Sequence, residues 1–427
     1  MPPRSRASTS ETDAAPKVWP TYRPPHRRIA DAQTHEDTAD LPPIFEHRLV
    51  PDNAPAIVDT DADLARLIHQ LREAGRFAYD TEFIGEQTFH PVFCLIQVAT
   101  ADRVTLIDPL SETLDCTPFW ALLGDASVEK VVHAGQQDLE PAMRFADVPA
   151  ANVFDTQVAG GFIGKPYPLS LRKLMAEACT HGSEVDLGTD HKFSRWDRRP
   201  LSDAQQMYAA NDVRYLLMLR ECLVKKLEAL GHRSKAEAEF AALCEPDALR
   251  NDPLSMKLRA KGAGRMRRSQ QAVCDALRKW RYAEAESRDV PVRRFLDDQT
   301  LVDLAKLKPE KVQDVLTCKG VPRPIKEHFA QTIVDVTAEA LAGELPEKRK
   351  VHQPMSDEAA DRLAGLWPAV RRHAEDRSID PTMLLSKREL TELVRAEDEG
   401  RPLPDNRLRR GWRAAFLKPV LGDLVTP

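Results

Sequence analysis

The segment AYDTEFIG, residues 78–85, combines a short apolar and aromatic run with two acids, Asp80 and Glu82. Such a run predicts a β-strand. Alternate residues of a strand point to the same face, so acids at positions i and i+2 would share one face of a sheet. Taken alone, the same tripeptide also fits a strand end that meets solvent.

Two later segments carry side chains that suit the same site. In HAGQQDLE, residues 133–140, Asp138 follows the apolar run VEKVV; on its own it would be a helix acid favoured by the macrodipole. In MYAANDVRYL, residues 207–216, Tyr208 and Asp212 are spaced i, i+4 within a helical pattern and so share a helix face. A buried tyrosine bonded to a neighbour one turn away is the alternative for this pair.

Together these side chains predict a site for two divalent cations. Hard cations such as Mg2+ and Mn2+ prefer carboxylate oxygens. Two of them roughly 3.5–4 Å apart can clamp the attacking and leaving oxygens of a phosphodiester. This is the chemistry of a nuclease. Because gathered carboxylates repel one another, we expect the pocket to be poorly formed until metal neutralises it.

Five segments in this order, DTEF, HAGQQDLE, VFDTQVAG, RWDRRPLS and YAANDVRYL, resemble ribonuclease D and the wider DEDD exonucleases, in the subgroup whose third motif is Tyr-x-x-x-Asp. The resemblance covers about residues 50–230 and implies an α/β, ribonuclease H-like domain. Strands first, then alternation with helices, also predict a mixed sheet covered by helices. The resemblance implies a 3'-5' exoribonuclease that releases nucleoside 5'-monophosphates, with tRNA precursors as its RNA substrates.

The resemblance also implies a role for each side chain of the set. The first-motif acids Asp80 and Glu82, the second-motif acid Asp138 and the third-motif acid Asp212 would hold two Mg2+ or Mn2+ ions. Tyr208 would orient the attacking water. A phenol ionises near pH 10 in its unperturbed state, which suits hydrogen bonding better than proton abstraction.

Nearby residues are less specific. Asp155 in VFDTQ either supports the site from behind or caps the helix that follows it. His133, at the end of the VEKVV strand, is more typical of a structural histidine than of a ligand.

A basic loop precedes the helix that contains Tyr208. It is predicted to grip phosphates and to stack a base, and an exposed charged turn is the alternative. The family usually has a small polar or acidic residue just before the tryptophan of this loop, where this chain has an arginine. The residues predicted to bind nucleic acid are Lys192, Arg195, Trp196, Arg198 and Arg199.

Composition bounds the class of protein. With 427 residues, of which 42% are hydrophobic and 30% charged, two or three globular domains are expected. No segment approaches the roughly 18 uninterrupted apolar residues of a membrane helix, and the start of the chain lacks the apolar core of a secretory signal. The seven cysteines are widely spaced and include no CxxC pair, which predicts reduced thiols, a cytoplasmic location and no structural zinc.

The chain divides into five segments by pattern. Residues 1–45 are rich in Pro, Ser, Thr and charge and are predicted to be disordered. The 50–230 domain is followed by a connector at 231–265. Residues 266–345, with WR-x-x-x-A-x-x-R-D-x-P and then D-x-x-L-x-x-LAK, resemble the all-α HRDC domain. Residues 355–427 repeat the order of helix, Asp-Pro turn and leucine helix, which predicts a second HRDC-like domain.

Charge is segregated along the chain although the net charge is -5. Residues 257–294 hold about twelve Lys and Arg against about four acids, as expected of a surface that touches phosphates. A solvated helix face is the alternative. Basic residues of the tail either extend that surface or serve stability or a dimer.

Two other functions compete with the exoribonuclease. A nucleic-acid-binding scaffold built on an inactive nuclease would be expected to lack a metal acid, and none is missing. A DNA 3'-5' exonuclease would share the same site, but no polymerase or helicase motif accompanies it in this chain.

Overall fold

The structure, a computed structural model, describes residues 47–179, 194–249, 254–347 and 354–426. The predicted disorder of residues 1–45 and the predicted phosphate contact of Lys192 lie outside these residues. Residues 254–347 form one compact unit, and the remaining described residues form a larger one. Across the described ranges, no helix combines the length and apolar content that a bilayer span requires.

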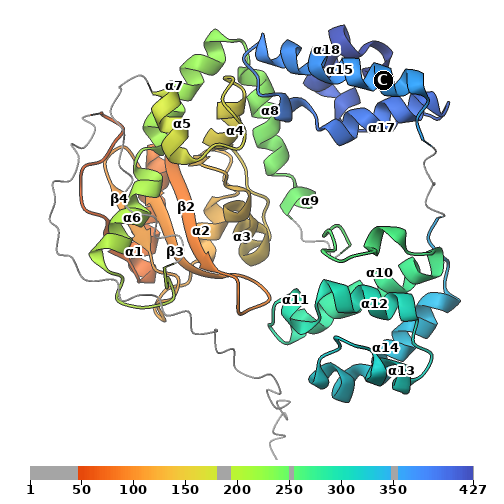
Figure 1. Ribbon diagram of the computed structural model, residues 1–427. Helices are drawn as coiled ribbons and strands as arrows, with labels where there is room; N and C mark the ends of the chain where they lie inside the picture. Colours follow the sequence, from red (N-terminus) through yellow and green to blue (C-terminus); the bar gives the residue numbers. More distant parts are fainter. Residues whose placement is uncertain (1–46, 180–193, 250–253, 348–353, 427) are drawn as a thin grey trace, which may run out of the picture. The chain divides into compact units, whose positions relative to one another are not determined.

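A six-stranded mixed sheet lies in the larger unit (Figure 1). In spatial order its strands are β1 (Ala56–Val58), β4 (Val104–Ile107), β3 (Val92–Ala99), β2 (Arg76–Ile84), β5 (Glu129–Val132) and β6 (Val153–Asp155). β3 runs antiparallel to both β2 and β4, and the other neighbours are parallel. The predicted mixed sheet is therefore confirmed.

Helices cover both faces of this sheet (Figure 1), and β3 is accordingly apolar except for Gln97, whereas β2 is interrupted by Asp80, Thr81 and Glu82. Residues alternate along β2. Phe77 and Tyr79 enter one core, with α1 (Asp61–Ala74), α2 (Thr117–Leu122) and α3 (Gln136–Ala146). Ala78 enters the other, with α4 (Thr156–Gly161), α5 (Leu171–Ala178), α6 (Asp203–Arg214) and α7 (Leu216–Ala229).

The segment expected to be a connector, residues 231–265, begins with two helices, α8 (Arg233–Leu243) and α9 (Pro246–Leu249). α8 packs on β6 and α4. Its Phe240 is buried against Phe154 of β6, with the ring centroids 4.8 Å apart. Because these apolar side chains complete the second core, α8 is part of the larger unit.

The C-terminal helices belong to the same compact unit as the sheet. Arg413 forms a bidentate ion pair with Glu239 of α8, at 2.6 and 2.5 Å, and Trp412 Nε1 donates to the same carboxylate at 2.9 Å. The helices are α15 (Asp357–Glu375), α16 (Pro381–Leu384), α17 (Lys387–Asp398), the short 3-10 turn η2 (Arg407–Arg409), α18 (Gly411–Leu421) and the turn η3 (Gly422–Val425). Their identity as a second HRDC-like domain stays a prediction.

The smaller unit is all-α, as predicted. Trp280, Phe295 and Phe329 form its aromatic core, with ring centroids 5.6 to 5.7 Å apart. Its elements are η1 (Ala263–Arg265), α10 (Arg268–Ser287), α11 (Val292–Phe295), α12 (Asp298–Leu307), α13 (Val312–Thr317) and α14 (Arg323–Ala342).

One buried ion pair holds α10 to the start of α12. Asp298 is 4% exposed and Arg281 is 6% exposed. The Asp298 carboxylate accepts from Arg281 Nη1 at 2.9 Å. The same carboxylate accepts at 2.9 Å from Arg293 Nε and from the backbone N–H of Arg259. Loss of this acid would leave a buried guanidinium without its counter-charge.

Asp298→Ala should therefore lower the free energy of unfolding of the smaller unit by about 3–5 kcal/mol, because it strands the charge of Arg281. Calorimetry of the full chain would record this as an earlier unfolding transition. The matched control is Glu327→Ala, which removes an exposed i, i+4 pair with Arg323 and should change little. A shift no larger than that of the control would contradict the role of the buried pair.

Candidate active site

Strand β2 presents two of the predicted acids on one face of the sheet. Asp80 lies directly opposite Gln97 of β3, and Glu82 lies opposite Leu95. The pairing register shifts just after Glu82, where Phe83 pairs with Phe93. Such a bulge bends a strand and re-aims the neighbouring side chains. Both acids are half-buried, at the carboxyl end of the strand.

Asp138 reaches β2 because the neighbouring strand stops short. β5 pairs with β2 only as far as Ala78, opposite Val131. Beyond that point β2 has no strand on its β5 side within the described part of the chain, and α3 starts there. The Tyr79 hydroxyl donates to the backbone carbonyl of Asp138 at 2.6 Å, and the Thr81 hydroxyl donates to its carboxylate. Sequence analysis did not single out these two donors, although strand alternation places them on the face opposite Asp80.

Asp155 fulfils both roles considered for it. It is the N-cap of α4, and its carboxylate accepts from the backbone N–H groups of Gln157 and Val158 at 2.8 and 3.2 Å. The same carboxylate accepts from Ala134 and Gly135 at 3.2 and 3.1 Å, in the turn that leads into α3. Asp155 thereby fixes the start of the helix that carries Asp138.

The turn between β5 and α3 has two further constraints. A Cβ at Gly135 would lie 2.6 Å from the Val132 side chain, so no larger residue fits without a shift. Both ring nitrogens of His133 are engaged, Nδ1 with Thr156 Oγ1 at 2.9 Å and Nε2 with the Leu169 carbonyl at 3.1 Å. His133 is thus structural, as expected.

Helix α6 supplies the remaining pair. Its start is fixed by a capping box between Ser202 and Gln205. The helix packs across β2, β3 and β4, and Tyr208 and Asp212, one turn apart, are both half-buried. The Tyr208 ring lies 6.2 Å from that of Trp196.

The four carboxylates interact through their charges. The pKa of the Asp80 carboxyl is raised well above its usual value, first by burial and then by the negative charges of Asp138, Asp212 and Glu82, in that order. Burial also raises the pKa of Asp138 to about 6, against the lowering effect of the Thr81 hydrogen bond. Acids from β2, α3 and α6 therefore lie within range of one another's charge.

This donor set fits hard divalent cations. Carboxylate oxygens are their preferred ligands, and the negative charge around Asp80 is the repulsion that a bound cation would relieve. Within the described ranges, no group of three or more His, Cys, Asp or Glu side chains has the spacing that would hold a metal ion as it stands. The acids would thus have to move closer together to share an ion, as expected for a site that carries this much like charge.

The basic loop before α6 differs from its prediction. Trp196 is only 1% exposed and packs with Leu95, Leu106 and Ala209. The prediction that Trp196 stacks on a base is wrong, because both ring faces lie in this core. The charged residues around the ring resemble a binding loop in sequence, whereas the ring itself anchors the loop to β3, β4 and α6.

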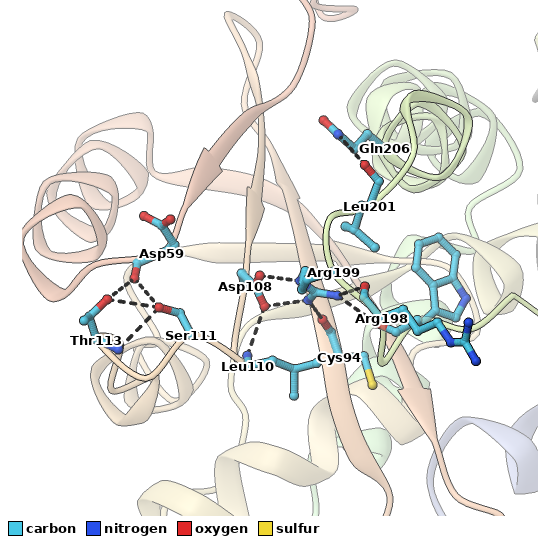
Figure 2. Close-up of polar contacts among 11 residues, drawn as sticks. Asp59, Cys94, Asp108, Leu110, Ser111, Thr113, Arg198, Arg199, Leu201 and Gln206 are labelled. Atoms are coloured by element: carbon cyan, nitrogen blue, oxygen red, sulfur yellow. Dashed lines mark hydrogen bonds and ion pairs between the residues drawn. The ribbon is translucent and has the colours of Figure 1, made fainter.

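The arginines of this loop divide into two kinds. Arg199 forms an ion pair with Asp108 and donates to the Cys94 carbonyl at 2.6 Å, so its guanidinium holds the loop on the sheet (Figure 2). Arg195 is exposed and pairs with Asp197 at 2.6 Å. Arg198 is exposed, and Figure 2 shows its guanidinium pointing away from the Arg199 network. Of the described arginines of the loop, Arg195 and Arg198 therefore remain proposals for phosphate contact.

Comparison with known proteins agrees with this arrangement. The family model described as 3'-5' exonuclease matches residues 55–228, and the HRDC domain model matches residues 270–337. Ribonuclease D of Gluconacetobacter diazotrophicus is 33% identical over 374 residues, 86% of this chain and 91% of the relative. Ribonuclease D of Pseudomonas paraeruginosa is 33% identical over 371 residues, 84% and 95% of the two chains.

A solved structure extends this similarity to three dimensions. The crystal structure of Escherichia coli RNase D, described as an exoribonuclease involved in structured RNA processing, matches with a TM-score of 0.72 and 27% identity. The match covers 87% of this chain and 98% of that protein. Domain order, fold and sequence agree over most of the length, and the chain belongs to the ribonuclease D family of 3'-5' exoribonucleases, whose DEDD-type exonuclease fold implies dependence on divalent metal.

Proposed function

We propose that this enzyme trims the 3' ends of structured RNA, including tRNA precursors, by two-metal-ion hydrolysis that releases nucleoside 5'-monophosphates. The observation that carries the proposal is the mutual charge interaction of Asp80, Glu82, Asp138 and Asp212, which come from three separate elements. Two Mg2+ or Mn2+ ions are the cations that this number of carboxylates suits.

The four acids would hold the ions, and each has its own support. Asp80 and Glu82 are fixed by the strand register, Asp138 by the hydrogen bond from Thr81, and Asp212 by α6. Cations bound there would supply an activated water and neutralise charge developing on the phosphate. Tyr208, one helical turn before Asp212, would hydrogen-bond the attacking water. Positioning and charge stabilisation are the main needs of phosphoryl transfer.

The smaller unit offers a surface for the body of the RNA. Arg278 and Arg281 are buried and hold that unit together. Other basic residues of the 257–294 stretch are exposed and would add positive charge to a surface that meets phosphates: Lys257, Arg259, Lys261, Arg265, Arg267, Arg268, Lys279, Arg288, Arg293 and Arg294. The HRDC match of residues 270–337 supports this role. A cytoplasmic location is part of the proposal, supported by seven cysteines without a disulfide.

Asp80→Asn and Asp212→Asn should each lower the rate of RNA hydrolysis by about a hundredfold or more, because each removes a charged ligand. Folding should survive, and the thermal midpoint of Asp80→Asn should not fall, because one repelling charge is gone. Mononucleotide release and circular dichroism would measure the two effects. Asp203→Asn, on an exposed residue at the start of α6, is the control and should keep full activity. Full activity in either site variant would remove that residue from the mechanism.

The stabilising effect of Mg2+ should depend on pH. The folded-state pKa of Asp138, about 6, lies above the value of about 3.9 for an unfolded Asp. Between these values the native state binds more protons than the unfolded state, so this contribution stabilises the metal-free protein at low pH and is lost as pH rises through 6. Protons compete with the cation for the same oxygens. The increase in Tm caused by Mg2+ should be small near pH 5 and grow up to about pH 7.5.

Differential scanning calorimetry with and without Mg2+ across this range would test the dependence. In Asp138→Asn the dependence on pH should be reduced, since one of the titrating carboxyls is absent. A Mg2+ effect that is equal at both ends of the range, or larger at the acid end, would contradict a metal site built on these acids.

Matched RNA and DNA oligonucleotides labelled at the 3' end should separate the possible activities. With Mg2+ or Mn2+, label should leave RNA as a nucleoside 5'-monophosphate, and a chelator should stop the release. A tRNA precursor with a 3' extension should be shortened from that end. Release from DNA alone would favour the DNA exonuclease, and binding without release from either would favour the scaffold.

A further inference from the structure

Gln97 lies in the second half of β3, directly opposite Asp80. Residues directly opposite one another in an antiparallel pair have their side chains on the same face, with Cβ atoms about 4.5–5.5 Å apart. Gln97 therefore projects to the α6 side of the sheet, as Asp80 does. Its side chain is fully buried, at 0% exposure.

Its neighbours on the sheet are apolar except for the acids of β2, with Asp80 directly opposite and Glu82 diagonal to it. On the same strand face Gln97 is flanked by Leu95 and Ala99, and its partner on the other side, on β4, is Leu106. The residues of α6 buried in the cores on this side are Ala209, Ala210 and Val213. A glutamine among aliphatic side chains needs a specific reason, because an apolar residue of similar volume would pack there without a polar group to satisfy.

The amide of Gln97 is without a hydrogen-bond partner among the residues that the structure describes. Neither Nε2 nor Oε1 is bonded within those ranges. Buried side-chain amides are almost always bonded, because an unmet donor or acceptor keeps its full desolvation penalty. Because the unbonded amide lies beside Asp80, we expect it to form a hydrogen bond in another state of the enzyme, such as the one with metal or RNA bound.

We propose that Gln97 is a positioning residue for Asp80: its Nε2 donates to the carboxylate oxygen nearer the sheet and leaves the other oxygen for a cation. This inference rests on the proposed role of Asp80 as a ligand. The side chain of Gln97 is long enough to span the gap between two strands. With a cation bound, this hydrogen bond would hold one oxygen of Asp80 and orient the other toward the cation, whereas in the metal-free fold the amide has no partner among the described residues.

Gln97→Met tests the proposal because it keeps a similar volume and removes both polar atoms. In the metal-free enzyme the Tm should equal or exceed that of the wild type, since the unpaired amide is gone. The Mn2+ concentration that gives half of the maximal Tm shift should rise about tenfold, and kcat should fall by a similar factor with the KM for RNA nearly unchanged. Substitution of a residue with a purely structural role would change neither the Mn2+ concentration for half of the maximal Tm shift nor kcat in this way.

Two controls make the outcome specific. Ile96→Val, on the same strand but in the opposite core, should leave the Mn2+ response unchanged. In an Asp80→Asn background, adding Gln97→Met should have no further effect on Mn2+ binding, because the two residues act as one unit. Gln97→Leu carries the same test if methionine does not fit the space.

The results also separate this inference from the proposed function. Wild-type Mn2+ affinity and kcat in Gln97→Met, with Asp80→Asn inactive, would overturn the role of Gln97 and leave the metal site standing. Full Mn2+ response and activity in Asp80→Asn would overturn both. A lower metal-free Tm in Gln97→Met, with an unchanged Mn2+ response, would assign Gln97 to packing alone.

Discussion

The constraint on which this structure depends is the repulsion among four carboxylates at the carboxyl end of β2. The pKa of the Asp80 carboxyl is raised first by burial and then by the negative charges of its three acidic neighbours, and the second of these causes is this repulsion. Such a cluster lowers stability wherever the acids are ionised and no cation is present. The rest of the larger unit must therefore supply enough packing and hydrogen bonding to hold the acids near one another. The two apolar cores on either side of the sheet do so.

Hydrogen bonds then determine where each acid lies within this frame. Because the pairing between β5 and β2 stops at Ala78, Asp138 can lie beside the later residues of β2. There the Tyr79 and Thr81 hydroxyls each donate to Asp138. Asp155 accepts from four backbone N–H groups, two in the turn before α3 and two in α4, so its carboxylate joins these two elements.

Residue spacing predicted which acids share a face of a strand or helix. It failed for side chains whose role depends on whether they are buried. The i, i+2 spacing on a strand and the i, i+4 spacing on a helix depend only on local geometry, so Asp80 with Glu82 and Tyr208 with Asp212 could be paired from sequence. Trp196 was misassigned because basic residues surround an indole in the same way whether the ring faces RNA or the core. Gln97 escaped notice because one polar residue in an apolar strand carries no signal until its cross-strand neighbour is known. The register between β2 and β3 depends on chain pairing, which no local pattern contains.

Among the described residues, the C-terminal helices do not contact the candidate site directly but are linked to it through a series of side-chain contacts. Arg413 binds Glu239 on α8, and the adjacent Phe240 packs with a tilted ring against Phe154, the residue before Asp155. Asp155 in turn holds the turn that starts α3 and so places Asp138. Each link is a buried contact with little freedom, and buried ion pairs are costly to break. The C-terminal helices thus stabilise the elements behind Asp138, a need that a cluster of like charges creates. The helices α10–α14 form a compact unit of their own.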